Sequence, residues 1–187
     1  MPVPRTAAAR RLSAIALWAL LSGLAPVRAS DVVGPEALTP FKAALMDALR
    51  SGLEAGPAAA VEHCRLVAPT LPAAQATGGL LVGRTSDRLR NPANAPPPWL
   101  APRLEALLAQ AEDDAWQGAV VHLEDGRDAW VEPIRIAGTC LSCHGESVAP
   151  RLEAVLRARY PQDAARGYAL GDVRGLFWVV PTPTSPR

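Results

Sequence analysis

Two of the chain's three cysteines and one of its three histidines fall within five consecutive positions. Cys140 and Cys143 are separated by two residues, and His144 follows the second thiol directly. The spacing Cys-x-x-Cys-His is the signature of c-type haem attachment, in which both thiols bond the porphyrin and the histidine binds its iron. The segment therefore predicts one covalently bound haem c, with Cys140 and Cys143 as its thioether residues and His144 as an axial iron ligand.

Other chemistries also use a Cys-x-x-Cys pair. A zinc site would need further ligands, and Cys64 with His63, His122 or His144 could complete a set of three cysteines and one histidine. A thioredoxin-like redox pair belongs in a βαβ unit, which this sequence does not predict, and a structural disulfide is a further alternative. Haem attachment is favoured because it accounts for both thiols and for the adjacent imidazole.

The second axial position of a haem iron decides whether the protein transfers electrons, binds a gas or catalyses a reaction. The sequence offers Met46, His63, Cys64 and His122 as candidates for this position. At about 100° per residue, the helix expected around residue 64 places Cys64 near the centre of an apolar arc, with His63 on its flank. Adjacent residues cannot both face one iron, so the helix favours the thiol, while a merely buried cysteine remains an alternative.

The first thirty residues have the three parts of a secretory signal. Arg5, Arg10 and Arg11 form a basic region, an apolar stretch follows, and small residues ending at Ala29 offer a cleavage site. The apolar stretch is shorter than the about 20 residues of a membrane span, although an uncleaved N-terminal anchor is an alternative. We therefore expect residues 1–29 to be a signal peptide and the protein to be periplasmic.

The charge of the exported chain argues against one class of partner. Removing residues 1–30 removes four arginines and no acidic residue, which leaves 15 basic against 18 acidic residues and a net charge of about −3. This mildly acidic balance, without a basic cluster, predicts no binding to nucleic acid. The remaining length is enough for one domain with a hydrophobic core.

Helix and strand patterns occupy different parts of the chain. Apolar residues recur at helical spacing over 39–52, 57–68, 100–111 and 150–160. Strand patterns lie at 80–86, on both sides of a two-residue turn at Asp125-Gly126, and at 167–180. Loops are expected over 73–79 and 88–99. This separation predicts an α+β domain with an antiparallel sheet, and neither a GxGxxG motif nor a P-loop indicates nucleotide binding.

The similarity extends beyond the haem signature to most of the chain after residue 61. The matching runs are EHCRLVAP, GRTS, RNPANAPPPW, CLSCHG with the signature itself, and YPQDAARGYALGDVRG, in this order. With them the sequence resembles a family of exported c-type haem proteins labelled domain of unknown function 3365. The resemblance implies a PAS-like fold, an antiparallel sheet flanked by helices. It also implies that the iron is bound axially by the motif histidine and by a cysteine on an early helix, which correspond here to His144 and Cys64.

Three arginines cluster in the segment that this resemblance covers, at positions 84, 88 and 90. Guanidinium groups bind carboxylates in a two-pronged geometry, so Arg84 and Arg90 are candidate contacts for the haem propionates. A solvated charge cluster is the alternative. The expected organisation is a signal peptide over 1–29, a single PAS-like haem-c domain over 30–180 and a disordered tail over 181–187.

The function that follows is that of a periplasmic c-type haem-binding protein with His/Cys-ligated iron. We expect a redox or gas (CO or NO) sensor, because exchange of a weak thiolate bond could serve as a signal. A low-potential electron-transfer cytochrome c is the alternative, and a haem peroxidase or nitrite-type reductase would require an open iron position. No catalytic arrangement of side chains is indicated, so we do not expect an enzyme. The expected partner is a periplasmic or membrane redox or signalling protein, and the oligomeric state stays open.

Overall fold

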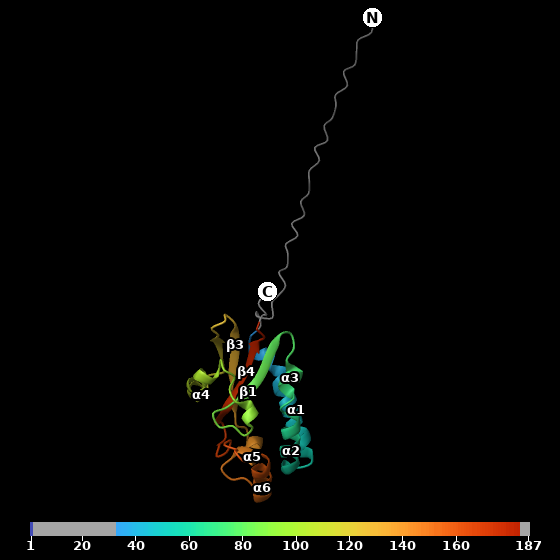
Figure 1. The fold of residues 1–187 in the computed structure, drawn as a ribbon, viewed down its shortest axis with the longest axis vertical. Helices are drawn as coiled ribbons and strands as arrows, with labels where there is room; N and C mark the ends of the chain where they lie inside the picture. Colours follow the sequence, from blue (N-terminus) through green and yellow to red (C-terminus); the bar gives the residue numbers. More distant parts are fainter. Residues whose placement is uncertain (2–32, 184–187) are drawn as a thin grey trace.

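The computed structural model describes residues 33–183, besides Met1. The signal peptide expected over residues 1–29 and residues 184–187 of the expected tail therefore lie outside the chain discussed below. Residues 33–183 form one α+β domain, in which a four-stranded antiparallel sheet is flanked by helices (Figure 1). This architecture confirms the predicted α+β class with an antiparallel sheet flanked by helices.

Most of the helices begin with a proline in their first turn, where a missing N–H costs nothing. The α-helices are α1 (Thr39–Glu54), α2 (Pro57–Val67), α3 (Leu71–Gln75), α4 (Leu104–Ala111), α5 (Leu141–His144) and α6 (Pro150–Arg159). Single 3₁₀ turns lie at Pro35–Leu38, Pro92–Asn94, Ala101–Arg103 and Gly138–Cys140. The loop expected over 73–79 is wrong in its first part, because Pro72 occupies the first turn of α3 instead of ending a helix.

The sheet has the strand order β1-β4-β3-β2, and every neighbouring pair is antiparallel. Its strands are β1 (Leu80–Thr85), β2 (Ala119–His122), β3 (Asp128–Arg135) and β4 (Val173–Pro181). The first strand thus pairs with the last, from Leu80 opposite Pro181 to Thr85 opposite Leu176. Regular pairing ends at Pro181, one residue beyond the expected domain end at 180, and Thr182 adds one more hydrogen bond from its N–H to the Gly79 carbonyl at 2.6 Å.

The hairpin between β2 and β3 forms where it was predicted, with a longer turn. Leu123 donates its N–H to the Arg127 carbonyl at 2.8 Å, and Gly126 donates to the Leu123 carbonyl at 3.0 Å. Three residues therefore connect the strands, and Gly126 alone of them has a positive φ, of 81°. This is a type I turn followed by a left-handed glycine, which corrects the expected two-residue turn.

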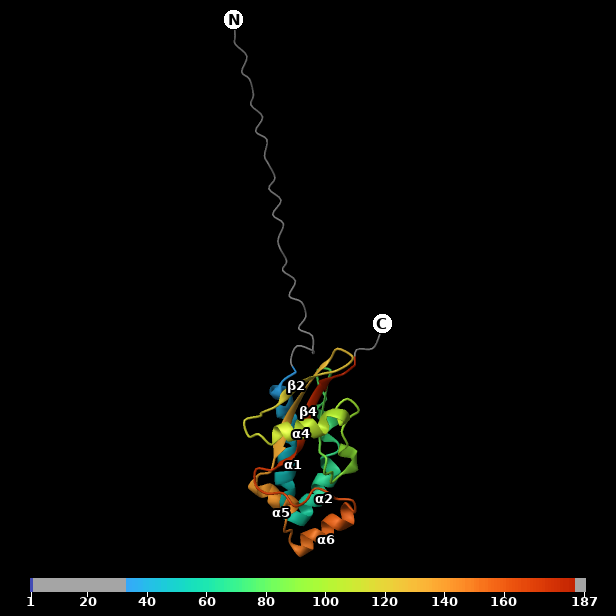
Figure 2. The same ribbon diagram turned by 90° about the vertical axis from the view of Figure 1, so that its left-hand side faces the viewer.

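Both faces of the sheet are buried, and β4 shows this most clearly. Leu176 and Val180 pack against α4, whereas Phe177 and Val179 between them pack against α1. Successive side chains of a strand point to opposite faces, so an uninterrupted apolar run marks a strand that is covered on both sides. Figures 1 and 2 show α4 on one side of the sheet and α1 on the other.

The helices α5 and α6 lie together at one end of the domain, next to α2 (Figure 2). Val61 of α2 packs against Leu152 and Leu156 of α6, and Cys143 of α5 borders this cluster. The end of the domain that carries the Cys-x-x-Cys-His motif therefore packs against α2. Among the described residues, no helix is long and apolar enough to cross a membrane.

Candidate functional site

A cavity of about 410 Å³ lies between α1, α2, α5 and the sheet. It brings together all six site residues that the sequence singled out, from four separate parts of the chain. These residues are Cys64 on α2, Arg84 on β1, Arg90 in the following loop, and Cys140, Cys143 and His144 in the motif. The remaining lining is mainly apolar, with Leu45, Val61 and Ile136 among its residues.

The periodicity of α2 turns Cys64 toward the cavity. Ala60 and Val61 are buried on the face that packs inside the domain, and Cys64 lies one turn beyond Ala60 on the same face. The thiol is half-buried and forms no disulfide. Burial raises the pKa of Cys64, and the positive charges of Arg84 and Arg90 act in the opposite direction. His63, the next residue on α2, does not line the cavity.

The motif segment, defined here as residues 138–145, consists of a 3₁₀ turn that continues into the four-residue α5. Cys143 and His144 follow Cys140 by three and four positions. In a helical turn, residues at this spacing lie on the same side. All three line the cavity, and both cysteines are half-buried and unpaired. The two thiols and the imidazole are thus presented to the same space.

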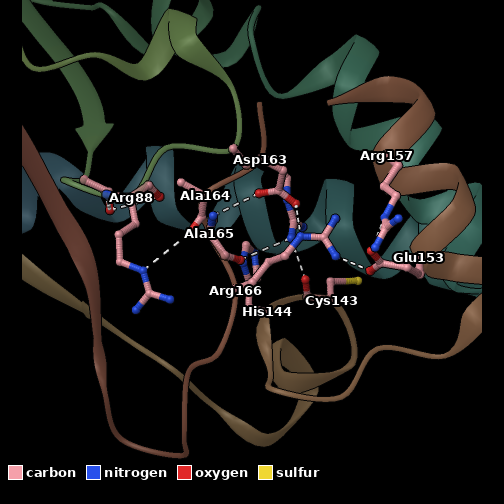
Figure 3. Close-up of polar contacts among 11 residues, drawn as sticks. Arg88, Cys143, His144, Glu153, Arg157, Asp163, Ala164, Ala165 and Arg166 are labelled. Atoms are coloured by element: carbon pink, nitrogen blue, oxygen red, sulfur yellow. Dashed lines mark hydrogen bonds and ion pairs between the residues drawn. The ribbon is translucent and has the colours of Figure 1, made fainter. Parts of the chain in front are cut away.

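A hydrogen bond fixes which nitrogen of His144 faces that space. Its Nδ1 lies 2.8 Å from the carbonyl oxygen of Ala165 (Figure 3). A carbonyl can only accept, so Nδ1 donates and Nε2 keeps its lone pair. Burial lowers the pKa of His144 to about 3, with further repulsion from Arg90 and Arg174. The imidazole is therefore neutral at physiological pH, the form in which histidine binds metals.

Arg90 holds the motif segment to the loop that precedes β4. Its guanidinium contacts the Asp163 carboxylate at 3.0 Å and donates to the carbonyl oxygens of Cys143 and Ala165. Both ionic side chains are shielded from solvent, and that of Asp163 is only 2% exposed. Burial alone would raise the pKa of Asp163, but the hydrogen bond and charge of Arg90 keep it below the ordinary value. Figure 3 shows Asp163 above Cys143 and His144.

Backbone hydrogen bonds complete this attachment. Tyr168 donates its N–H to the His144 carbonyl at 3.0 Å, and Gly167 donates to Gly145 at 3.1 Å. The Tyr168 ring meets the His144 ring edge to face, with centroids 6.3 Å apart. The orientation of His144 is thus determined by residues 165–168, which lie more than twenty positions further along the chain.

The other residues considered as axial ligands lie in different places. Met46 on α1 lines the same cavity as Cys64. His122, at the end of β2, is 81% exposed and its Nδ1 lies 2.7 Å from an Asp128 oxygen, outside the cavity. Within residues 33–183, no group of three or more His, Cys, Asp or Glu side chains converges closely enough to hold a bare metal ion.

Two further cavity residues were missed in the sequence, Arg174 and Tyr160. Arg174 is the second residue of β4, in a stretch whose alternating pattern does not reveal which face the arginine occupies. Tyr160 follows α6 directly and is the first residue of the motif YPQDAARGYALGDVRG. The same motif ends in GDVRG and includes Arg174, so the family resemblance was the one signal that could have included both residues.

The fold and the cavity define a class of protein: a one-domain α+β protein that presents thiols, an imidazole and guanidinium groups to a single internal space. The sequence matches the family model described as Tll0287-like over residues 42–181, and the chain belongs to this family. Among solved structures it is similar to the crystal structure of the cyanobacterial heme-protein Tll0287, with 23% sequence identity and a TM-score of 0.56. That likeness covers 83% of this chain and 99% of the other, and it supports the fold. No curated protein matches the chain in sequence.

Proposed function

We propose that the protein is a c-type haem protein with a PAS-like fold, in which one covalently bound haem occupies the cavity. One observation carries the proposal. The thiols of Cys140 and Cys143, the Nε2 side of His144 and the thiol of Cys64 all face one apolar space within a fold of the Tll0287-like family. The name of the solved relative describes it as a heme-protein, which supports the same cofactor here.

The residues present fit this cofactor in three respects. The space is apolar where a porphyrin would need apolar contacts, because Leu45, Leu49 and Ile136 line it. Its charged groups are cations, four arginines and Lys42, and guanidiniums suit the two carboxylates of a haem. The imidazole that would bind the iron is neutral and oriented by the Ala165 carbonyl, as metal-binding histidines ordinarily are.

In this proposal His144 and Cys64 are the two axial ligands, and Cys140 and Cys143 form the thioether bonds. A haem iron supplies reversible one-electron redox chemistry and binds diatomic gases. The protein's own contribution is to hold the imidazole in place through Ala165 and Tyr168, to exclude water with α1 and α2, and to supply the thiol from α2. Thiolate ligation favours ferric iron, so a low reduction potential is expected.

Redox or gas sensing is the function that this arrangement supports best. Cys64 is held by one helix, whereas His144 is held by two segments of the chain, so the thiol side is the one that can exchange. Met46 lines the same cavity and offers a second soft donor on α1. Both features support a protein that signals through a change of ligand, in the periplasm and to a protein partner, without itself acting as an enzyme.

A low-potential electron carrier is the second candidate. It is favoured by the fixed position of His144, since rigid ligation lowers the reorganisation that accompanies electron transfer. The two functions differ in what happens to Cys64 on reduction. A sensor releases the thiol or exchanges it for CO, whereas an electron carrier retains the same axial pair in both states.

Absorption and EPR spectra of the oxidised holoprotein test the axial assignment, with Cys64→Ser as the variant and His63→Gln as its matched control on α2. We expect the low-spin thiolate signals of the wild type to persist in His63→Gln and to disappear in Cys64→Ser. Identical spectra for the wild type and Cys64→Ser would contradict the assignment. Addition of CO to the reduced protein then separates the two functions, because slow binding with loss of the Cys64 bond indicates a sensor and no binding indicates a carrier.

A further inference from the structure

Four arginines line the cavity, Arg84, Arg90, Arg135 and Arg174. They are not equivalent. The guanidinium of Arg135 is bonded to the Ala111 and Asp113 carbonyls and to the Asp114 carboxylate. Arg90 has the Asp163 carboxylate as its counter-ion and uses its remaining contacts on backbone carbonyls of the motif segment and of residue 165. Its charge and its hydrogen-bonding capacity are therefore largely committed to holding the protein together, although the sequence suggested it as a propionate contact.

Arg84 and Arg174 have no such partner. Among residues 33–183, none of the ion pairs involves either of them, and the Nε of Arg174 is buried without any hydrogen bond. Burial lowers the pKa of both side chains, and the charge of Arg174 adds to this effect at Arg84. An arginine side chain stays protonated in a protein, so it cannot become neutral when it is buried. The two unpaired charges therefore carry a desolvation cost that only an anion can offset.

The sheet departs from regular pairing to bring Arg174 into the cavity. Ile134 pairs with Gly175 and Arg135 pairs with Val173, so Arg174 is the extra residue of a β-bulge. In a regular ladder it would lie opposite Arg135 and face α4, because directly paired residues share a face. The bulge gives that place to Val173, which is buried against α4, and Arg174 lines the cavity instead.

The backbone at the bulge leaves room only for glycine. Gly175 has a φ of 156°, and a Cβ atom there would lie 2.1 Å from the carbonyl oxygen of Thr85, the residue after Arg84. The backbones of β4 and β1 are thus in close contact at Gly175 and Thr85. These residues directly follow the two unpaired arginines, Arg174 and Arg84. A bulge that redirects one side chain is typical of binding sites.

Tyr168 provides an additional observation at the same place. Its hydroxyl is buried without a hydrogen-bond partner. The guanidinium of Arg174 lies 5.8 Å from its ring centroid, and that of Arg88 lies 4.1 Å from it. The ring thus contacts two arginines and, through its edge-to-face contact, His144.

We propose that Arg84 and Arg174 together form a receptor for two carboxylates, and that the haem propionates are these carboxylates. The inference rests on the proposed haem function and goes beyond it by exchanging Arg90 for Arg174. Two guanidiniums and two carboxylates cancel in charge, and guanidinium forks match carboxylates in geometry. Arg90 acts instead as a positioning residue for the motif segment.

This arrangement has a measurable consequence for the iron. The ferric state carries one more positive charge than the ferrous state, so a nearby cation disfavours oxidation. Replacing Arg84 or Arg174 with neutral glutamine removes a cation at constant haem ligation, and the reduction potential falls. A guanidinium bonded to a propionate also determines the vibrations of that carboxylate, which a merely structural arginine would leave unchanged.

The test uses the holoprotein with Arg84→Gln, Arg174→Gln and the double variant. Arg157→Gln is a control of equal charge change on the exposed side of α6, away from the cavity. We expect the resonance Raman bands of the propionates to shift in each cavity variant and the potential to fall, furthest in the double variant. Arg84→Lys and Arg174→Lys keep the charge but lose the two-pronged contact, so their bands should shift while their potentials stay near the wild type.

Coloured variants with wild-type bands and wild-type potentials would overturn the inference. If the glutamine variants do not fold, a crystal structure of the wild-type holoprotein decides: propionates within hydrogen-bond distance of Arg84 and Arg174 support it, and propionates turned to solvent or bound to Arg90 overturn it. A colourless wild type is a different result, because it contradicts the proposed haem function and not the choice between these arginines.

Discussion

The two faces of the sheet are filled in different ways. The α4 face, the side on which α4 packs, is closed by aliphatic and aromatic side chains, and its central residue Leu176 is fully buried. The cavity face, on the side of α1 and α2, has a similar apolar cluster around Phe41 near one end but opens into the cavity near α5. There the groups that meet are thiols, guanidiniums and an imidazole.

The α4 face contributes mainly to the stability of the fold, whereas the cavity face carries the candidate site. Apolar packing on the α4 face needs no ligand and contributes roughly in proportion to its buried area. On the cavity face, the arrangement depends on a few charged contacts, chiefly Arg90 with Asp163, which are costly to leave incomplete. Substitutions on the two faces should therefore differ in how much they lower stability and in whether they also change the cavity.

The largest single effect is expected from Asp163→Asn on the cavity face. Loss of the carboxylate leaves the buried Arg90 without its counter-ion, which costs about 3–5 kcal/mol. Urea unfolding of the holoprotein measures the loss, and the exposed pair of Asp47 with Arg50 supplies Asp47→Asn as a control. A loss below about 1 kcal/mol would show that the pair contributes as a surface pair does.

On the α4 face, Leu176→Ala should cost about 2–4 kcal/mol, because the side chain is 0% exposed and truncation leaves a void. The proposed axial ligands, Cys64 and His144, line the cavity on the other face, so the absorption spectrum of the folded variant should match that of the wild type. Thermal unfolding monitored by circular dichroism gives the stability, and Val120→Ala on the exposed part of β2 serves as control. An altered spectrum would show that the two faces are coupled.

Acid should loosen the cavity face before the α4 face. The pKa of Asp163 lies below its ordinary value of 3.8, so its stabilising effect is complete above that value and is lost as the pH falls through the lower folded pKa. We expect amide exchange in residues 138–145 to accelerate below about pH 4 while β4 stays protected. In Asp163→Asn, exchange in the same segment should be fast at neutral pH as well.

The smallest effect is expected at the surface of α6. Arg157 bonds Glu153 at 2.6 Å, but its side chain is 78% exposed. Arg157→Gln should change the free energy of unfolding by less than about 0.5 kcal/mol. A change above about 1 kcal/mol in urea unfolding would mean that the exposed ion pairs of α6 also support the cavity.

Much of the fold was predictable because it follows from local patterns. The helix starts expected at residues 39 and 57 agree with the starts of α1 and α2, although Leu38 and not Thr39 caps α1, and the apolar run of β4 marked a buried strand. The hairpin was located by Asp125-Gly126, but its turn has three residues, since Asp-Gly suits either length. The extra helix at Leu71–Gln75 was missed because a proline can begin a helix as well as end one.

Site residues were predictable where the pattern of a single helix or motif determines their position. They were not predictable where their position depends on a contact between two elements. The motif fixed Cys140, Cys143 and His144 as a group, and the periodicity of α2 turned Cys64 inward. The bulge that admits Arg174 arises from a mismatch between two strands, and the contact of Arg90 with Asp163 joins residues 73 positions apart. Neither leaves a signal in the sequence of one element alone.

The pairing of the first strand with the last affects the order of events during maturation. Leu80 lies opposite Pro181, so this part of the sheet cannot close until almost the whole domain has been synthesised. Long-range strand pairing of this kind is slow compared with the formation of a single helical turn. If the proposed haem is attached, Cys140 and Cys143 would therefore still be accessible to the attaching machinery, and the cavity would close around a group already bonded to the chain.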